Sequence, residues 1–216
     1  MSSTRPIVYV VDDDVSVRES LEGLIQCEGW QAQTFPSAQA FFSHTFSCVP
    51  SCLLLDVSLP DVNGLDVQER VAADRCEMPI IFITGHADIP MTVRAMKAGA
   101  REFFTKPFGD DTLIEAIRSA LARSEAALGR DKALRDLRRR YASLSRRERE
   151  VMARVVCGLL NKQIGYELEI SETTVKAHRG RVMRKMEAGS LAELVTMASQ
   201  LNESREPATG SDSILH

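Results

Sequence analysis

Residues 51–64 constrain the fold most. They contain an apolar run, residues 52–55, that ends abruptly on the carboxylate of Asp56. Residues 52–55 lack polar alternation, which is typical of a strand buried on both faces in a parallel sheet. Pro60 and the polar residues around it then end the strand. Asp56 is therefore predicted at the carboxyl end of a central strand, where open α/β sheets place their sites, unless it only caps the next turn.

A second predicted strand ends in the same way. Residues 6–11 are apolar and lead into three adjacent carboxylates, Asp12, Asp13 and Asp14. Adjacent carboxylates repel each other, and no core needs them. Together with Asp56 they offer oxygen ligands suited to a hard divalent cation such as Mg²⁺, although Asp14 alternatively caps the helix that follows.

Two further predicted strands end on residues of different chemistry. Residues 79–83 end on Thr84, and residues 101–105 end on Lys106, which Pro107 follows. In a parallel sheet, a hydroxyl and an ammonium group would therefore join the carboxylates at one edge. Each of these residues has a plainer alternative role as a turn former or surface charge, but their coincidence at four strand ends favours a site.

In this order and spacing, the strand-end residues resemble the receiver domain of two-component response regulators over about the first 120 residues. The residues that carry the resemblance are Asp12, Asp13, Asp56, Thr84, Lys106 and Pro107. The resemblance implies a flavodoxin-like α/β fold, a doubly wound parallel five-stranded sheet in the order 2-1-3-4-5. The alternation of predicted strands and helices independently favours a doubly wound parallel sheet.

The resemblance also implies roles for these side chains. Asp56 is the expected phosphoacceptor, because a carboxylate can accept a phosphoryl group as an acyl phosphate. Thr84 and Lys106 are expected to contact phosphoryl oxygens. The implied cofactor is Mg²⁺, with Asp13, Asp56 and the backbone carbonyl of Ser58 as ligands and Asp12 acting through water. A cis bond before Pro107 is expected to aim the ammonium group.

A conformational switch is the next implication of the resemblance. Phosphorylation is expected to draw Thr84 inward, and Phe103 is then expected to swing into the vacated space. The remodelled surface is the expected face of an isologous dimer, since it carries apolar and oppositely charged groups: Met91, Arg94, Lys97, Arg101 and Glu102. The alternative is that phosphorylation releases a DNA-binding domain which the receiver inhibits.

A long helix is predicted after the fifth strand. Apolar residues recur at mostly three- and four-residue steps from residue 110 to about residue 140, and only Gly129 interrupts them. Residues 130–140 are highly charged, so a flexible charged linker is the alternative to one continuous helix.

The remaining residues predict four helices with a helix-turn-helix pattern. Ser145 and Glu148 form a capping-box sequence before an apolar helix. A short helix over residues 161–168 is followed by a turn and by Ser171, the N-cap of a basic helix that extends to about residue 186. The last helix is expected over residues 191–201.

This second block resembles the LuxR-type DNA-binding domain, on motif residues Leu144, Ser145, Arg147, Glu148, Gly158, Asn161, Lys162, Ile164, Leu168, Ile170, Ser171, Thr174, Val175, Lys176, His178, Arg179, Lys185 and Met186. Receiver, linker and this domain in this order resemble the NarL/FixJ class, and residues 89–91 and 96–100 resemble its FixJ-like branch. Three features depart from the pattern. Gly165 stands where Ala is usual and is expected to soften its helix, Gly180 lies inside the recognition helix, and residues 187–189 replace a more apolar junction before the last helix.

The expected DNA contacts lie on the basic helix, and a solvated charged face is the alternative reading of these residues. Lys176 and Arg179 are three residues apart on one face and are predicted to reach base edges. The other predicted DNA-binding residues are Thr174, Arg181, Arg184 and Lys185, of which the last three suit phosphates.

Charge supports two domains with different partners. The chain has a net charge of −3, but residues 1–109 carry 8 basic and 14 acidic residues, whereas residues 143–201 carry 10 and 7. We predict a receiver domain at 1–122, a helical linker at 123–142, a DNA-binding domain at 143–201 and a disordered tail at 202–216. No apolar run approaches the roughly 18 residues needed to span a membrane, and no signal peptide opens the chain, so we expect a cytoplasmic protein without a membrane partner.

The expected function is that of a phosphorylation-dependent transcriptional regulator. Its expected partners are a sensor histidine kinase, promoter DNA, a second copy of the chain when phosphorylated, and RNA polymerase. As an enzyme it would catalyse only its own phosphoryl transfer and dephosphorylation. A haloacid-dehalogenase-type hydrolase is disfavoured because Ser58 replaces the required second Asp, and a constitutive DNA-binding protein is disfavoured because the acidic set is intact.

Overall fold

The computed structural model describes residues 5–60, 62–74, 78–85 and 89–203 of the 216-residue chain. The chain divides into two compact units, Met1–Gly129 and Arg130–His216. Among the described residues, no helix combines the length and the apolar character needed to cross a membrane.

A five-stranded parallel sheet forms the centre of the first unit. Its strands are β1 (Ile7–Val11), β2 (Gln31–Phe35), β3 (Ser51–Asp56), β4 (Ile80–Thr84) and β5 (Glu102–Thr105). They are arranged in the order β2-β1-β3-β4-β5, which confirms the predicted doubly wound topology. β1, β3 and β4 are buried along their whole length, which explains why they are continuous apolar runs in the sequence.

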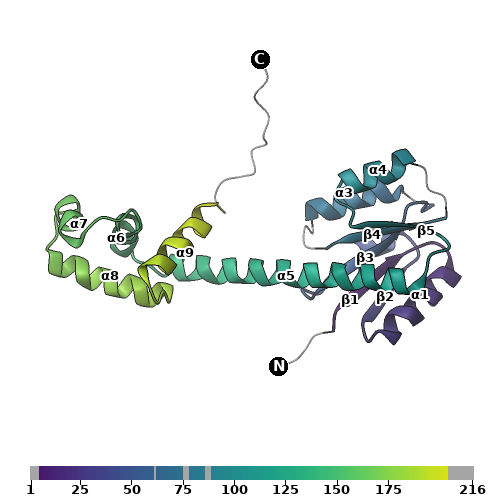
Figure 1. The fold of residues 1–216 in the computed structure, drawn as a ribbon, viewed down its shortest axis with the longest axis horizontal. Coiled ribbons are helices and arrows are strands. Elements are labelled where there is room, and N and C mark those ends of the chain that lie inside the picture. Colours follow the sequence, from purple (N-terminus) through teal and green to yellow (C-terminus); the bar gives the residue numbers. More distant parts are fainter. Residues whose placement is uncertain (1–4, 61, 75–77, 86–88, 204–216) are drawn as a thin grey trace, which may run out of the picture. The chain divides into compact units, whose positions relative to one another are not determined.

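Helices cover both faces of this sheet. Figure 1 shows α3 (Gly64–Asp74) and α4 (Ile89–Lys97) on one side of the strands, and α1 (Val15–Cys27) and α5 (Asp110–Ala142) on the other. The short α2 (Ala38–Phe42) packs with α3 and α4 in one core cluster, and α1 and α5 share a second cluster. Successive strand residues point to opposite faces, so each strand contributes to both cores.

The fifth helix is continuous over 33 residues, as predicted, and no flexible segment replaces its charged second half. Asp110 and Asp111 lie in its first turn and Arg139 and Arg140 in its last turn, where each charge complements the helix dipole. The unit boundary after Gly129 falls within this helix.

The second unit contains the four predicted helices, α6 (Arg146–Val156), α7 (Asn161–Leu168), α8 (Glu172–Met186) and α9 (Leu191–Glu203). The capping box before α6 is present. Leu137 of α5 belongs to the core of this unit, six residues before the proposed domain start at 143. α9 ends two residues beyond its predicted end, and residues 204–216 of the proposed tail lie outside the described residues.

The turn between α7 and α8 is tight, as the sequence predicted. Glu169 ends α7 in the left-handed conformation, with φ 55° and ψ 43°. The backbone N–H of Ile170 donates to the carbonyl of Gly165 over 3.0 Å. A Cβ atom on Gly165 would lie 2.8 Å from the carbonyl oxygen of Ile170, so this glycine allows a close approach of the backbone and does not merely soften the helix.

Candidate functional site

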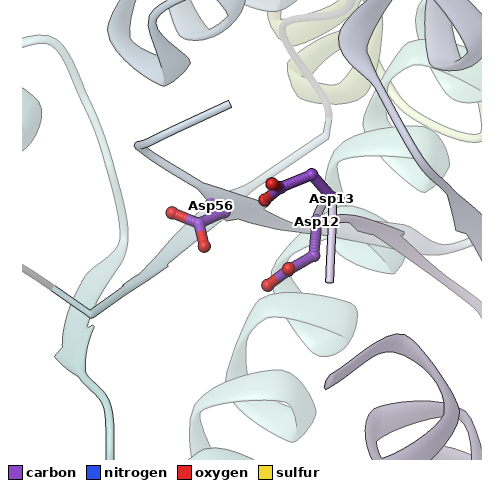
Figure 2. Close-up of side chains that lie close together, drawn as sticks. All are labelled: Asp12, Asp13 and Asp56. Atoms are coloured by element: carbon purple, nitrogen blue, oxygen red, sulfur yellow. The ribbon is translucent and has the colours of Figure 1, made fainter. Parts of the chain in front are cut away.

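Three carboxylates meet at the carboxyl edge of the first unit's sheet (Figure 2). Asp12 and Asp13 follow β1, and Asp56 is the last residue of β3. The parallel register pairs Val11 with Leu55, which places Asp12 beside Asp56. One oxygen from each carboxylate can be chosen so that all three lie within 4.8 Å of one another. The predicted clustering is therefore observed, with Asp12 and Asp56 buried and Asp13 exposed.

Lys106 bridges two of these carboxylates. Its Nζ atom lies 2.6 Å from Asp12 Oδ2 and 2.8 Å from Asp56 Oδ2. The residue follows β5, and its backbone N–H donates to the carbonyl of Thr84 at the end of β4 over 2.8 Å. The peptide bond before Pro107 is cis, as predicted. The end of β5 thus places an ammonium group directly at the acidic cluster.

Burial and charge act in opposite directions on this pair. Burial raises the pKa of Asp12 above its usual range, and the hydrogen bonds from Lys106 and the Asp14 backbone only partly offset this effect. Burial by itself would lower the pKa of Lys106, but its hydrogen bonds to Asp12 and Asp56 outweigh burial and raise it. Lys106 is therefore a firmly held cation, and an additional positive charge would favour the ionised form of Asp12.

The donor set fits a hard divalent cation. Its three carboxylates supply oxygen atoms, the ligands that Mg²⁺ prefers, from both buried and exposed positions. Ser58 lies at the same edge, since its backbone N–H donates to Asp56 Oδ1 over 2.8 Å. The cluster is therefore an acidic site that could bind a metal, which agrees with the site predicted from the sequence.

Two contacts at this site had no assigned role in the sequence. Arg18 of α1 donates from Nη1 to the carbonyl oxygen of Asp12 over 2.7 Å. A Cβ atom on Gly64 would lie 2.7 Å from the carbonyl oxygen of Asp56 and 2.8 Å from the Cα atom of Val57. Gly64 was visible in the sequence as part of a turn, but its approach to the Asp56 backbone depends on how α3 packs against β3.

The predicted switch residues lie on β4 and β5. Thr84 is fully buried at the end of β4. Phe103 is half-buried in β5, and its ring centroid lies 6.0 Å from that of Phe82 in the adjacent strand. On the expected dimer face, the side chain of Met91 lies outside the described residues, and the exposed members are Arg94, Lys97, Arg101 and Glu102.

The predicted DNA-binding side chains of α8 differ in exposure and in contacts. Four are exposed, Lys176, Arg181, Arg184 and Lys185, whereas Thr174 and Arg179 are half-buried. Lys176 forms an ion pair with Glu172 on the same helix. Arg179 donates to Asn161 Oδ1 over 3.2 Å, and the Thr174 hydroxyl forms a 2.8 Å hydrogen bond with Ser171 Oγ.

Lys185 is exposed but makes two contacts within the domain. Its Nζ atom lies 2.7 Å from Glu148 Oε2 and 3.1 Å from the carbonyl oxygen of Ser143. Glu148 is buried in α6, and the hydrogen bond from Lys185, followed by that from the Ser145 backbone, lowers its pKa. The predicted phosphate contact at Lys185 would therefore compete with an ion pair that joins α6 to α8.

Comparison with known proteins agrees with both halves of the chain. Residues 8–118 match the family described as response regulator receiver domain, and residues 142–198 match bacterial regulatory proteins of the luxR family. Nodulation protein W of Bradyrhizobium diazoefficiens is 46% identical over 200 residues, which cover 93% of this chain and 88% of that protein. The transcriptional regulatory protein FixJ of the same species is 41% identical over 196 residues, covering 91% and 96%.

A solved structure gives the same result. The response regulator StyR superposes with a TM-score of 0.83 at 43% identity, covering 91% of this chain and 100% of that one. The similarity therefore extends through both domains and the helix between them. The chain belongs to the two-component response regulators of the NarL/FixJ class, in which a receiver domain and a LuxR-type DNA-binding domain together act as a transcription regulator.

Proposed function

We propose that Asp56 accepts a phosphoryl group from a sensor histidine kinase, and that this modification controls promoter binding by the second domain. The observation that carries the proposal is the position of Lys106, whose ammonium group contacts both Asp12 and Asp56. A cation at this point offsets the repulsion between the carboxylates and lies beside the oxygen that would attack phosphorus.

The transfer needs little covalent chemistry from the protein. An Asp56 oxygen forms the new bond to phosphorus, the bond from phosphorus to the donor's histidine nitrogen breaks, and that nitrogen keeps the electron pair and takes up a proton. The transition state spreads negative charge over three equatorial oxygens, so positioning and charge neutralisation dominate. Lys106 neutralises one oxygen after leaving Asp56, and the hydroxyl of Thr84 donates to another.

Mg²⁺ is the proposed cofactor. Asp13, Asp56 and the backbone carbonyl of Ser58 would hold the ion, with Asp12 acting through water, and the clustering of three carboxylates supports this choice. When bound, the ion supplies positive charge to the phosphoryl oxygens. The chain catalyses only its own phosphorylation and dephosphorylation, and Ser58 occupies the position where a haloacid-dehalogenase-type hydrolase would require a second Asp.

Phosphorylation is proposed to act through the neighbouring aromatic residue. When Thr84 moves toward the phosphoryl group, Phe103 responds by packing, since its ring has no hydroxyl. The exposed surface of Arg94, Lys97, Arg101 and Glu102 would then pair two receivers and raise the effective concentration of the second DNA-binding domain on an inverted repeat. The further proposed partners are promoter DNA and RNA polymerase. We propose that the protein acts in the cytoplasm.

The test separates phosphorylation from its consequence. Asp56→Asn should abolish acid-labile phosphate incorporation from acetyl phosphate in the presence of Mg²⁺, whereas Asp66→Asn, an exposed carboxylate in the first turn of α3, should retain it. Wild-type incorporation by Asp56→Asn would refute the assignment. Analytical ultracentrifugation of the beryllofluoride-treated protein should show a dimer; a protein that stays monomeric yet binds its operator more tightly would leave release of inhibition as the mechanism.

A further inference from the structure

The recognition helix has one line of residues that points directly away from its own domain. Val175, Val182 and Met186 of α8 are buried in the domain core. At about 100° per residue, the opposite side of the helix carries Thr173, Ala177, Gly180 and Arg184, and all four are exposed. If α8 enters a DNA groove, the backbone along this outward line, at Ala177 and Gly180, approaches the base edges most closely, while the long side chain of Arg184 can extend to a phosphate.

Gly180 has no structural reason to be a glycine. It lies in the interior of α8, outside the group of glycines with positive φ, and a Cβ atom added to it would meet nothing within 4 Å. The contrast with Gly64 and Gly165 is clear, because a Cβ atom there would collide with backbone. Since glycine is less favourable than alanine inside a helix, this position carries a stability cost without an internal benefit.

The basic side chains that the sequence assigned to base reading are placed less favourably for it. Arg179 is half-buried and bonded to Asn161 of α7, and Lys176 forms an ion pair with Glu172 at 3.1 Å. Arg181 and Arg184 are exposed and have no ion-pair partner among the described residues. The outward line therefore carries two small uncharged residues, Ala177 and Gly180, and the exposed Arg181 and Arg184 follow them along the helix.

We propose that Gly180 sets how closely the α8 backbone approaches the base edges of the major groove, and that Ala177 contacts a thymine methyl group there. Arg181 and Arg184 anchor the helix on the phosphates beside the groove. Alanine methyl groups suit the C5-methyl group that only thymine displays in this groove. This inference rests on the proposed function, because it specifies which residues of the DNA-binding domain select the sequence.

The first experiment compares two glycines in the same full-length chain. Gly129 also lies inside a helix, is exposed, and has nothing within 4 Å of an added Cβ atom. The probe is a duplex recovered from a random library by the beryllofluoride-treated wild-type protein, with a scrambled duplex for comparison. Gly180→Ala and Gly129→Ala should both raise the melting temperature, but only Gly180→Ala should weaken binding to the selected duplex, by about tenfold or more.

The outcomes distinguish a failure of this inference from a failure of the proposed DNA-binding function. Binding of the selected duplex by Gly180→Ala at wild-type strength would overturn the role of Gly180. Equal weakening for the selected and scrambled duplexes would overturn it too, because close approach to bases must affect specific binding more. A wild-type protein that enriches no sequence would instead refute the proposed DNA-binding function.

A second experiment tests the thymine contact. Each thymine of the selected duplex is replaced in turn by deoxyuridine, which lacks only the methyl group. One position should lose about fourfold in affinity for the wild-type protein, the value expected for one buried methyl group, and Ala177→Gly should be insensitive to that replacement. The assignment of Ala177 is overturned if no position responds, or if the variant responds as the wild type does.

Discussion

The carbonyl oxygen of Asp56 lies so close to Gly64 that a Cβ atom on Gly64 would come within 2.7 Å of it. The start of α3 therefore packs directly against the end of β3 that presents the proposed phosphoacceptor, Asp56. Gly64 has no reactive side chain, but its contact with the Asp56 backbone helps to fix the geometry of the site.

Gly64→Ala is expected to destabilise the receiver domain by about 1–3 kcal/mol, because the added methyl group must push α3 away from β3. Phosphorylation of Asp56 should slow in the same variant. The matched control is Gly23→Ala in α1, where nothing lies within 4 Å and the change should stabilise by about 0.5–1 kcal/mol. Urea unfolding measures both; an unchanged midpoint for Gly64→Ala would show that the contact relaxes without cost.

Acid should weaken the DNA-binding domain through Glu148. Its pKa is lowered by the hydrogen bonds from Lys185 and from the Ser145 backbone, so its contribution to stability is complete above the unfolded pKa of about 4.3. That contribution is lost as the pH falls through the lower folded value. Glu148→Gln should cost about 1–3 kcal/mol near neutral pH and make the loss of stability below about pH 4.5 shallower.

The control for this pH dependence is Glu167→Gln. Glu167 is exposed and pairs with Arg154 at 2.7 Å on the surface of the same domain, where such pairs contribute about 0–1 kcal/mol. Unfolding free energies are measured from pH 7 to pH 3. Parallel curves for the wild type and Glu148→Gln would contradict the expected role of the buried carboxylate.

Arg184 and Lys185 are adjacent, but their replacement by alanine should have different effects on DNA affinity and on stability. Arg184→Ala should reduce the slope of log affinity against log salt by about one, because the exposed guanidinium neutralises a phosphate. Lys185→Ala should leave that slope nearly unchanged and lower the unfolding midpoint, since it breaks the contact with Glu148. DNA titrations at several salt concentrations, together with thermal melts, give both readouts. Equal loss of slope in both variants, at wild-type stability, would make Lys185 a phosphate contact.

Leu137 of α5 should stabilise the second unit, although it precedes the proposed start of the DNA-binding domain. Its side chain is 6% exposed within the core that contains Val151 and Met186, so Leu137→Ala should cost about 2–5 kcal/mol. Hydrogen exchange of the full chain should show faster exchange in α6–α9 and unchanged exchange in β1–β5. Leu160→Ala, at a side chain that is 70% exposed, is the control and should have little effect.

The sequence by itself determined the sheet and the acidic site. Parallel strands buried on both faces must be apolar along their length, and the polar residue that ends each one is necessarily at the same edge. Asp12, Asp56, Thr84 and Lys106 could therefore be assigned to one place before any contact was known. The capping box at Ser145 was equally readable, because its hydrogen bonds join residues three apart.

Only the tertiary structure decided which basic residues of α8 are available. Arg179 and Lys185 look like Arg181 and Arg184 in the sequence, but their partners Asn161 and Glu148 are supplied by other helices.

The packing of separate elements also distinguishes the two glycines of the DNA-binding helices. Gly165 is closed in by the Ile170 carbonyl, whereas Gly180 faces open space, and both occupy ordinary helix positions in the sequence. Local pattern fixes which way a side chain points from its own helix or strand; what it meets there depends on how separate elements pack, and that information is not contained in spacing along one element.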